Sequence, residues 1–276
     1  MEYDLWPQSR SQVTARKTMQ PQPIFNSDSA PAQSAGFALG GLALAARAER
    51  LNRRWAEAPT DRILAEAIEL AFKGRIAVVS SFGAEAAVLL HLVAKVDRAT
   101  PILFLETGKH FLETLTYRDI LIDRFGFTDA RSLEPNPADL AREDPAGDLW
   151  SKQPDRCCHL RKVLPLDKAL QGFDAWITGR KRYQTSHRAA LPFAEVSDGR
   201  IKINPLARWS EPQINQAFKD FRLPRHPLFD DGFASIGCAP CTRRILDGED
   251  SRAGRWAGSE KTECGIHFGF TDGEGI

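Results

Sequence analysis

Short, wholly apolar segments that alternate with helical patterns constrain the fold of this chain more than any other feature of its sequence. Three such segments lie at 76–79, 102–105 and 175–177, and a polar or glycine-containing turn follows each one directly. Apolar residues at helical spacing predict helices over 84–96 and 113–125, after the first two segments. This alternation is typical of an α/β fold with a doubly wound, mostly parallel sheet. Ligands of such sheets bind beyond the carboxyl ends of the strands, where these turns lie.

The 276 residues are enough for one sizeable core with appendages or for two small domains. Residues 1–38 are rich in Gln, Ser, Pro and Ala, which predicts a disordered or loosely ordered extension. We expect an α/β domain over 39–245, opening with helices over about 42–56 and 60–74. The glycine-rich residues 246–276 are expected to form a mobile C-terminal segment.

Composition and charge narrow the class of protein. A net charge of +1 argues against a protein dedicated to nucleic acid. No uncharged apolar stretch is long enough to span a bilayer, and the N-terminus lacks the order of a secretory signal. We therefore expect a cytoplasmic protein with no membrane partner, in which five cysteines serve as ligands or nucleophiles rather than disulfides.

The turn after the first apolar segment has the composition of an anion site. Ser80, Ser81 and Gly83 stand between a predicted buried strand and a helix N-terminus, where hydroxyl and backbone N–H groups favour negative charge. The sequence is neither a Walker A motif nor Gly-x-Gly-x-x-Gly, so a P-loop NTPase or a Rossmann dehydrogenase is not supported. The alternative is an ordinary turn in which a serine caps the helix.

Four of the five cysteines form two pairs. Cys157 and Cys158 are adjacent, whereas Cys238 and Cys241 form a Cys-x-x-Cys. Two such pairs predict a four-thiolate metal site, and their spacing alone does not separate zinc from an iron–sulfur cluster. The alternatives are a redox-active Cys-x-x-Cys, which lacks the thioredoxin-like context here, and unconnected buried cysteines.

Cys264 stands apart, near the C-terminus and among many glycines. A thiol on a flexible segment suits a nucleophile that must visit a substrate and then a second protein. Lys261 and His267 could lower its pKa by favouring the thiolate. The alternative is an incidental tail cysteine.

These pieces, in this order, resemble the APS/PAPS reductase family within the adenine nucleotide α-hydrolase-like superfamily. The resemblance covers roughly residues 45–270 and is most specific in the combination of Cys-Cys, Cys-x-x-Cys and Glu-Cys-Gly-x-His. The matching segments are 80–85, 105–108, 157–162, 178–182, 237–243, 252–256 and 263–267.

The resemblance implies a thioredoxin-dependent reductase of sulfate assimilation and cysteine biosynthesis. Its cluster-bearing branch holds a 4Fe–4S cluster through cysteines that match Cys157, Cys158, Cys238 and Cys241. That branch mostly reduces adenylyl sulfate (APS), whereas enzymes acting on the 3′-phosphorylated form (PAPS) usually lack these four. Cys264 matches the residue that attacks the sulfonucleotide sulfur. AMP leaves, and thioredoxin or a similar dithiol releases sulfite from the Cys S-sulfonate.

A thiolate that attacks an anionic sulfonyl group needs fixed positive charge nearby. Lys162 lies four residues after Cys158, so one helical turn would place its ammonium on the side of the ligand cysteines. Arg252 and Arg255 match the family's phosphosulfate-binding pair, and the resemblance adds Arg188. The alternative for each cation, taken singly, is a solvated surface charge.

The other expected substrate contacts are Ser80, Ser81, Gly83, Gly179 and His267. Because dithiol exchange can supply the whole reduction, we hypothesise that the cluster is structural and electrostatic. A homo-oligomer is left open.

Three other functions compete with this one. Many APS-type enzymes carry Asp where this chain has Ala86, and the Ser-Ser-Phe-Gly turn looks like the PAPS-type loop, so a PAPS reductase with the same chemistry is the first alternative. An ATP-pyrophosphatase-type adenylating enzyme shares the fold but has no use for the five cysteines. A zinc-binding module without catalysis is the third.

Overall fold

The computed structural model describes residues 31–258, 261 and 263–267, with side-chain surroundings from residue 40 onward. Contacts divide the chain into two units, residues 1–38 and 39–276. Of the extension predicted over 1–38, residues 1–30 lie outside the described residues. Of the mobile C-terminal segment predicted over 246–276, residues 259–260, 262 and 268–276 lie outside them.

The first described element is helix α1 (Pro31–Trp55), which begins well before the predicted start near residue 42. Pro31 suits the first turn of a helix, because the N–H it lacks would have no helical partner there. Gly40 and Gly41 obscured the pattern, since each glycine costs a helix about 1 kcal/mol relative to alanine. From Leu51 to Trp55 the helix is anchored by buried side chains.

A six-stranded sheet organises the second unit in the order β3-β2-β1-β4-β6-β5. All neighbouring strands are parallel except β5 and β6, which form an antiparallel hairpin. The predicted doubly wound, mostly parallel α/β sheet is confirmed, and the three predicted strands are β1, β2 and β4. The strands are β1 (Ile76–Ser80), β2 (Ile102–Leu105), β3 (Ala130–Leu133), β4 (Ala175–Ile177), β5 (Ala194–Ser197) and β6 (Arg200–Ile203).

The chain builds this sheet outward from β1 in two directions. It first adds β2 and β3 on one side and then returns to add β4 on the other. The strand order reverses between β1 and β4, and this switch point is where open α/β sheets bind ligands beyond their carboxyl ends. The topology thus selects the turns after β1 and β4 as the place for a site.

Helices and short helical turns connect the strands. The longer ones after α1 are α2 (Thr60–Ala65), η1 (Glu66–Ala71), α3 (Ala86–Val96), α4 (Leu112–Phe125), α5 (Pro137–Glu143), α8 (Leu164–Ala169) and α9 (Glu211–Asp220). The shorter ones are α6 (Leu149–Lys152), α7 (Pro154–Cys158), η2 (His159–Val163), η3 (Arg182–Gln184), η4 (Ser186–Arg188), η5 (Ala239–Cys241) and η6 (Gly265–His267). Among the described residues, none of these helices has the length and apolar character to cross a bilayer.

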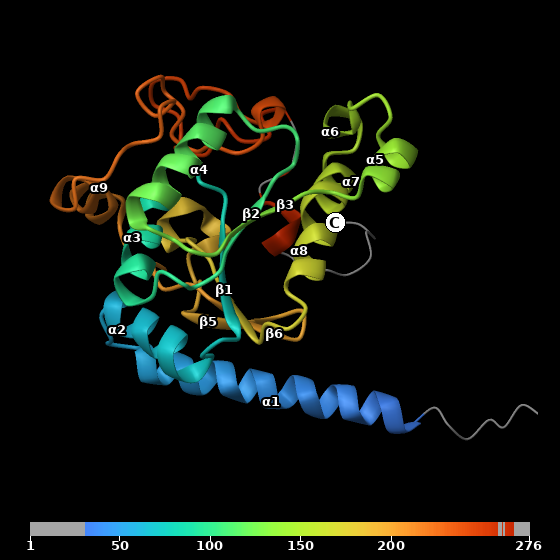
Figure 1. Cartoon of the computed structure of the whole chain (residues 1–276), viewed down its shortest axis with the longest axis vertical. Coiled ribbons are helices and arrows are strands. Elements are labelled where there is room, and N and C mark those ends of the chain that lie inside the picture. The colour runs from blue at the N-terminus through green and yellow to red at the C-terminus, as the bar shows by residue number, and fades with distance from the viewer. Residues whose placement is uncertain (1–30, 259–260, 262, 268–276) are drawn as a thin grey trace, which may run out of the picture. The chain divides into compact units, whose positions relative to one another are not determined.

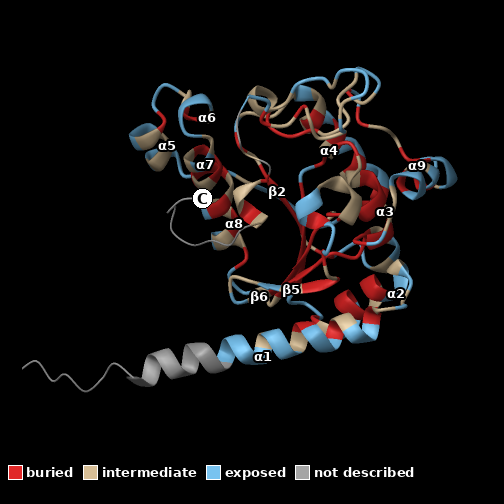
Figure 2. Ribbon diagram, turned by 180° about the vertical axis from the view of Figure 1, so that it is seen from behind, coloured by how far each residue is buried: buried red, intermediate tan, exposed pale blue. Residues whose placement is uncertain are grey.

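The sheet separates two hydrophobic cores, because successive side chains of a strand point to opposite faces. Val78 of β1 packs with the larger core, which includes buried side chains of α2, α3, α4 and α9. Ala77 and Val79 face the smaller core, where Trp176 of β4 meets α8 and Ile266 of the C-terminal segment. Figure 1 shows α3 and α4 on one side of the strands and α8 on the other, and in Figure 2 the central strands between them are buried.

The helix that carries the adjacent cysteines is wound in two ways. Residues 154–169 run through α7, the π-helical turn η2 and α8 without a break. Pro165 lies in the first turn of α8, where its ring has no N–H to donate and would crowd the Arg161 carbonyl. The wider π turn over His159–Val163 relieves this crowding. That turn sets the direction of Lys162.

The long segment after α9 is held by short pairings rather than by regular structure. An isolated bridge joins His110 to Cys238, and another joins Thr242 to Arg255. The second bridge requires Gly254, because a Cβ there would lie 2.2 Å from the Arg243 carbonyl oxygen. These contacts bring the Cys-x-x-Cys turn and the Arg255 segment against the end of β2.

We expect Gly254→Ala to destabilise the protein, because backbone and not a flexible side chain blocks the new methyl group. Overpacking of this kind costs about 1–3 kcal/mol. Gly41→Ala is the matched control: a Cβ at this helical position has no neighbour within 4 Å, so the change favours the helix. Thermal midpoints followed by circular dichroism should fall for Gly254→Ala and rise slightly for Gly41→Ala. Equal midpoints for Gly254→Ala and the parent would refute the packing argument.

Candidate active site

A cavity of about 240 Å³ opens at the carboxyl ends of β1, β2 and β4. All of the side chains and glycines that the sequence predicts as substrate contacts line it, and so does Cys264. They are Ser80, Ser81, Gly83, Lys162, Gly179, Arg188, Arg252, Arg255 and His267. Segments separated by more than one hundred residues of sequence therefore meet at the predicted place.

The turn after β1 is fixed by its own contacts. The Phe82 N–H donates to the Ser80 hydroxyl oxygen over 3.2 Å, and the buried Phe82 ring packs edge-on against Phe104. Phe82 has a φ of 46°, in the left-handed region. Gly83 lies so close to the Ile236 carbonyl that a Cβ would approach it to 3.0 Å. Helix α3 begins at Ala86 without a side-chain cap, so Ser80 stabilises the turn and not the helix.

Glu85 is the centre of a network that the sequence did not predict. Its carboxylate accepts from Lys181 Nζ over 2.6 Å, from Gln184 Nε2 over 2.8 Å, and from the Tyr183 hydroxyl. Burial opposes ionisation of Glu85, but Lys181 and the hydrogen bonds outweigh it and lower its pKa. This network ties the turn after β1 to the segment after β4.

The four paired cysteines line one small second cavity. Cys157 and Cys158 end α7, Cys238 directly precedes η5, Cys241 ends it, and all four are free thiols. The Thr107 hydroxyl lies 3.3 Å from Cys238 Sγ. Among the described residues, no three His, Cys, Asp or Glu side chains are placed to hold a single metal ion. What the structure shows is four thiols around a common space.

Two cations from η2 also line this second cavity. Arg161 pairs with the buried Asp144 over 2.5 Å and donates to the Thr107 carbonyl over 2.7 Å. Burial disfavours the charge of Lys162, but electrostatic attraction to the sulfur atoms of Cys264, Cys238 and Cys158 outweighs it and raises the pKa of Lys162. Burial raises the pKa of Cys157 and Cys241, and the hydrogen bond with Cys264 together with burial raises that of Cys158, while the nearby cations oppose these shifts.

Cys264 lies beside this arrangement and is partly buried. A hydrogen bond from the Cys158 thiol, the nearby Lys162 ammonium and the Ile266 N–H lower the pKa of Cys264 well below its ordinary range, against the effect of burial. Cys264 therefore lines the large cavity with a lowered pKa and with Lys162 nearby.

Four buried polar atoms on residues that line the large cavity have no hydrogen-bond partner among the described residues. They are His110 Nδ1, Trp176 Nε1, Arg255 Nε and His267 Nδ1. The Arg255 guanidinium lies against Gly237, where a Cβ would approach it to 2.2 Å. Burial, together with the charges of Lys202 and Arg180, lowers the pKa of His267 well below its ordinary range. Unpaired buried donors and acceptors are costly, so these atoms mark a place for a polar ligand.

Arg188 is engaged with the C-terminal segment. Its Nε and Nη2 donate to the two oxygens of Glu263 over 2.6 and 2.7 Å, and its Nη1 donates to Gln184 Oε1. Arg252 lies 3.8 Å from the same carboxylate. The sequence motif contained Glu263, but its partner could not be read from the sequence because it is 75 residues away.

Lys202 of β6 lies beneath the C-terminal segment with 1% of its surface exposed. Its ammonium lies 4.6 Å from the Trp176 ring centre and 3.4 Å from the Ile266 carbonyl oxygen. The cation–π contact favours the charged form, but burial is the larger effect and lowers the pKa of Lys202 to about 6. Sequence analysis missed this residue, because a lysine in a short strand is typical of an exposed position.

Comparisons with known proteins identify the family of this chain. A family model described as the phosphoadenosine phosphosulfate reductase domain matches residues 75–244. A Mesorhizobium japonicum protein named adenosine 5'-phosphosulfate reductase is 48% identical over 225 residues, 82% of this chain and 89% of that protein. A Gloeobacter violaceus protein named phosphoadenosine 5'-phosphosulfate reductase is 39% identical over 79% of this chain and 92% of its own length. Both substrate names therefore occur among the relatives.

Solved structures give the same fold. A phosphoadenylyl-sulfate reductase from Candida auris, crystallised as a phosphate complex, has a TM-score of 0.61 and 26% identity, covering 71% of this chain and 96% of its own. An FMN adenylyltransferase from Candida glabrata has a TM-score of 0.50 and 15% identity, covering 79% and 76%. The second similarity concerns the fold alone.

The low pKa of Lys202 predicts how stability depends on pH. Its ordinary value is 10.5, so between about pH 6 and 10.5 the unfolded chain binds a proton that the folded protein does not. This residue therefore makes the free energy of unfolding rise by about 1.4 kcal/mol per pH unit as pH increases through that window.

Lys202→Met should remove this contribution and stabilise the protein most at the lower end of the window. Urea unfolding at pH 7, 8 and 9 measures the slope, with Lys219→Met on the exposed face of α9 as the control. An unchanged slope in Lys202→Met would show that Lys202 is charged in the folded protein.

Proposed function

This chain belongs to the phosphoadenosine phosphosulfate reductase domain family, and on that premise we propose that it is a thioredoxin-dependent APS reductase. It would convert APS to sulfite and AMP in sulfate assimilation and cysteine biosynthesis, in the cytoplasm, where thiols are kept reduced. The observation that carries the proposal is the position of Cys264. Its sulfur lies between a nucleotide-sized cavity and four further cysteines, with Lys162 beside it.

The first step is a displacement at sulfur. The Cys264 thiolate attacks the sulfonyl sulfur, a sulfur–sulfur bond forms, and the bond from that sulfur to the phosphate oxygen breaks with its electron pair leaving on AMP. In the second step a thiolate of the donor attacks Cys264 Sγ and sulfite departs with the electrons of the sulfur–sulfur bond. The donor's second thiol then releases Cys264, so that the donor is oxidised and the sulfonate is reduced.

Binding an anion next to a thiolate depends on the cations of the cavity. Lys162, Arg252 and Arg255 would carry the phosphosulfate, because forked guanidinium donors suit oxyanions. The unpaired His267 Nδ1 and Arg255 Nε are the atoms that such a ligand would satisfy. The turn with Ser80, Ser81 and Gly83, together with Gly179, would hold the nucleotide at the strand ends.

We further propose that Cys157, Cys158, Cys238 and Cys241 hold a 4Fe–4S cluster. Four free thiols around one space, drawn from two segments and flanked by Arg161 and Lys162, fit an anionic thiolate-ligated group. When bound, such a cluster would supply fixed negative charge and would cross-link the segment of Cys157 and Cys158 to that of Cys238 and Cys241. With Cys158 committed to iron, Lys162 and the Ile266 N–H would stabilise the Cys264 thiolate.

PAPS reduction is the second candidate function. It is favoured by the Gloeobacter relative, which is named for PAPS, and by the Ser-Ser-Phe-Gly turn at 80–83. The chemistry at Cys264 would be the same, and the difference would lie in a 3′-phosphate.

Turnover on the two nucleotides tests the function. We expect anaerobically purified protein to be brown and to contain iron, and to release sulfite from APS with reduced thioredoxin faster than from PAPS. A faster reaction with PAPS would establish the alternative. Colourless, iron-free protein that releases no sulfite from either nucleotide would refute the proposal.

Cys264→Ser should bind APS but form no protein S-sulfonate, because a hydroxyl at neutral pH is a poor nucleophile compared with a thiolate. Mass spectrometry of intact protein mixed with APS measures the added sulfonate. The parent protein should gain it in stoichiometric amount and the variant should not. A sulfonate on another cysteine of the variant would contradict the role of Cys264.

Lys162→Ala should keep its iron and lose S-sulfonate formation by about 10²–10³-fold, the usual effect of removing one charged stabiliser of an anionic transition state. Lys168→Ala, at an exposed position of α8 in the same helical run, is the control and should behave as the parent. Iron analysis and single-turnover kinetics are the measurements. Loss of iron in parallel with rate would make Lys162 a residue of cluster assembly instead.

A further inference from the structure

The residue next to the nucleophile is buried in an ion pair. Glu263 has 5% of its surface exposed, and the side chain of Arg188 is equally buried. Both carboxylate oxygens are bound in a forked arrangement over 2.6 and 2.7 Å. A charge at this depth is stable only while its partner stays in place, so the pair fixes the backbone one residue before Cys264.

The Arg188 side chain is itself fixed by further hydrogen bonds. Each of its three nitrogens has a protein acceptor, two on Glu263 and one on Gln184. Gln184 in turn accepts from the Lys181 N–H over 3.1 Å and donates to Glu85 over 2.8 Å. The ion pair is therefore anchored to the turn after β1 and the segment after β4, which are the rigid parts of the cavity.

A second anchor follows Cys264 on the other side. The Ile266 side chain is buried in the smaller core beside Trp176, and the Ile266 carbonyl lies 3.4 Å from Lys202 Nζ. At Gly265 a Cβ would lie 3.3 Å from a Val163 methyl group, so the backbone packs directly against the residue that precedes α8. Cys264 thus sits between two fixed points, one ionic and one apolar.

From this arrangement we infer that Glu263 and Arg188 are positioning residues, which hold the Cys264 sulfur in the place for attack. The inference rests on the proposed function for the substrate that Cys264 attacks. The clamp itself, by which we mean the ion pair of Glu263 and Arg188, does not depend on that function. Arg188 then acts through Glu263 and not by touching the phosphosulfate, which differs from the contact expected from the sequence. Arg252, 3.8 Å from Glu263 and lining the cavity, is the cation shared between the clamp and the ligand.

A double-mutant cycle tests the clamp in the iron-loaded enzyme with Glu263→Gln, Arg188→Gln and the double variant. If the two act as a pair, each single change lowers the S-sulfonate rate at saturating APS by about 10–100-fold, because a displacement of about 1 Å is enough for such a loss. The double variant should lose no more than the slower single one. Binding of APS, measured in a Cys264→Ser background, should stay near that of the parent.

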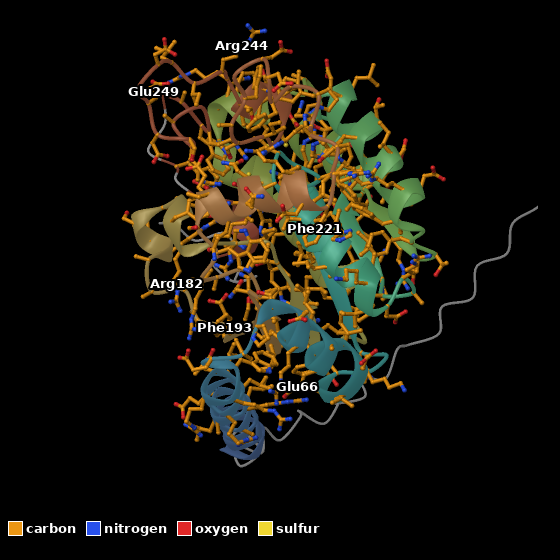
Figure 3. All side chains as sticks on the ribbon, turned by 90° about the vertical axis from the view of Figure 1, so that its left-hand side faces the viewer. Glu66, Arg182, Phe193, Phe221, Arg244 and Glu249 are labelled. Atoms are coloured by element: carbon orange, nitrogen blue, oxygen red, sulfur yellow. The ribbon has the colours of Figure 1, made fainter. Side chains whose placement is uncertain are left out.

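Alkylation of Cys264 by iodoacetamide gives a readout that needs no substrate. Its rate, followed by mass spectrometry of the C-terminal peptide, should rise in both single variants because the segment is released. Glu249→Gln is the matched control: Glu249 also forms a forked ion pair, with Arg243 over 2.7 and 2.8 Å, but at the surface of the molecule (Figure 3). It should leave both rates unchanged.

Glu263→Asp keeps the charge and shortens the side chain, so it should keep its iron and show an intermediate loss of rate. The clamp is overturned if Arg188→Gln weakens APS binding while Glu263→Gln does not, if the two losses add, or if alkylation and rate stay at the parent's values. If the parent forms no S-sulfonate from APS or PAPS yet the alkylation rates change as expected, the proposed function fails and the clamp stands.

Discussion

Buried positive charge beside buried thiols is the interaction on which the rest of this site depends. Lys162 and Arg255 lie among the free thiols at the carboxyl ends of the strands, where water cannot compensate an isolated charge. For Lys162 the attraction of the nearby sulfurs outweighs burial and raises its pKa, whereas for Arg255 burial is the larger effect and lowers its pKa. Lys162 in turn helps to lower the pKa of Cys264 and opposes the rise in pKa of Cys158 and Cys241. The cations that stabilise the thiolates are also the groups that an anionic substrate would meet first.

The fold makes this arrangement possible by bringing distant segments to one edge of the sheet. Parallel strands end at the same edge, so the turns after β1 and β4 meet without a dedicated connection. The π turn before Pro165 then directs Lys162, and the His110–Cys238 bridge places the second cysteine pair. Arg161 joins these parts, because it binds the Thr107 carbonyl at the end of β2. Stability and site geometry therefore share the same contacts.

The sequence was a good guide wherever a single segment carried its own signal. The apolar runs of β1, β2 and β4 were predicted, whereas β3 was not, because three of its four residues are exposed. Cysteine spacing predicted that four thiols lie together, but Glu85, Lys202 and Glu263 owe their roles to hydrogen-bond partners 64 to 99 residues away. Pairings over such distances leave no local pattern, and a buried charge looks in sequence like a surface one.

The ionic character of the anchor at Glu263 suits the proposed role of Cys264, in which its sulfur meets first a substrate and then a dithiol donor. Cys264 is partly buried next to Cys158, so on that proposal a protein donor would reach its sulfur after a movement of the segment. A buried ion pair adds little net stability over an apolar one of the same shape, because desolvation offsets most of the attraction. Arg188 and Glu263 can therefore specify where Cys264 stands without binding the segment so tightly that it cannot leave. Replacing Arg188 and Glu263 by well-packed apolar residues would keep Cys264 in the same position but hinder the movement of its segment.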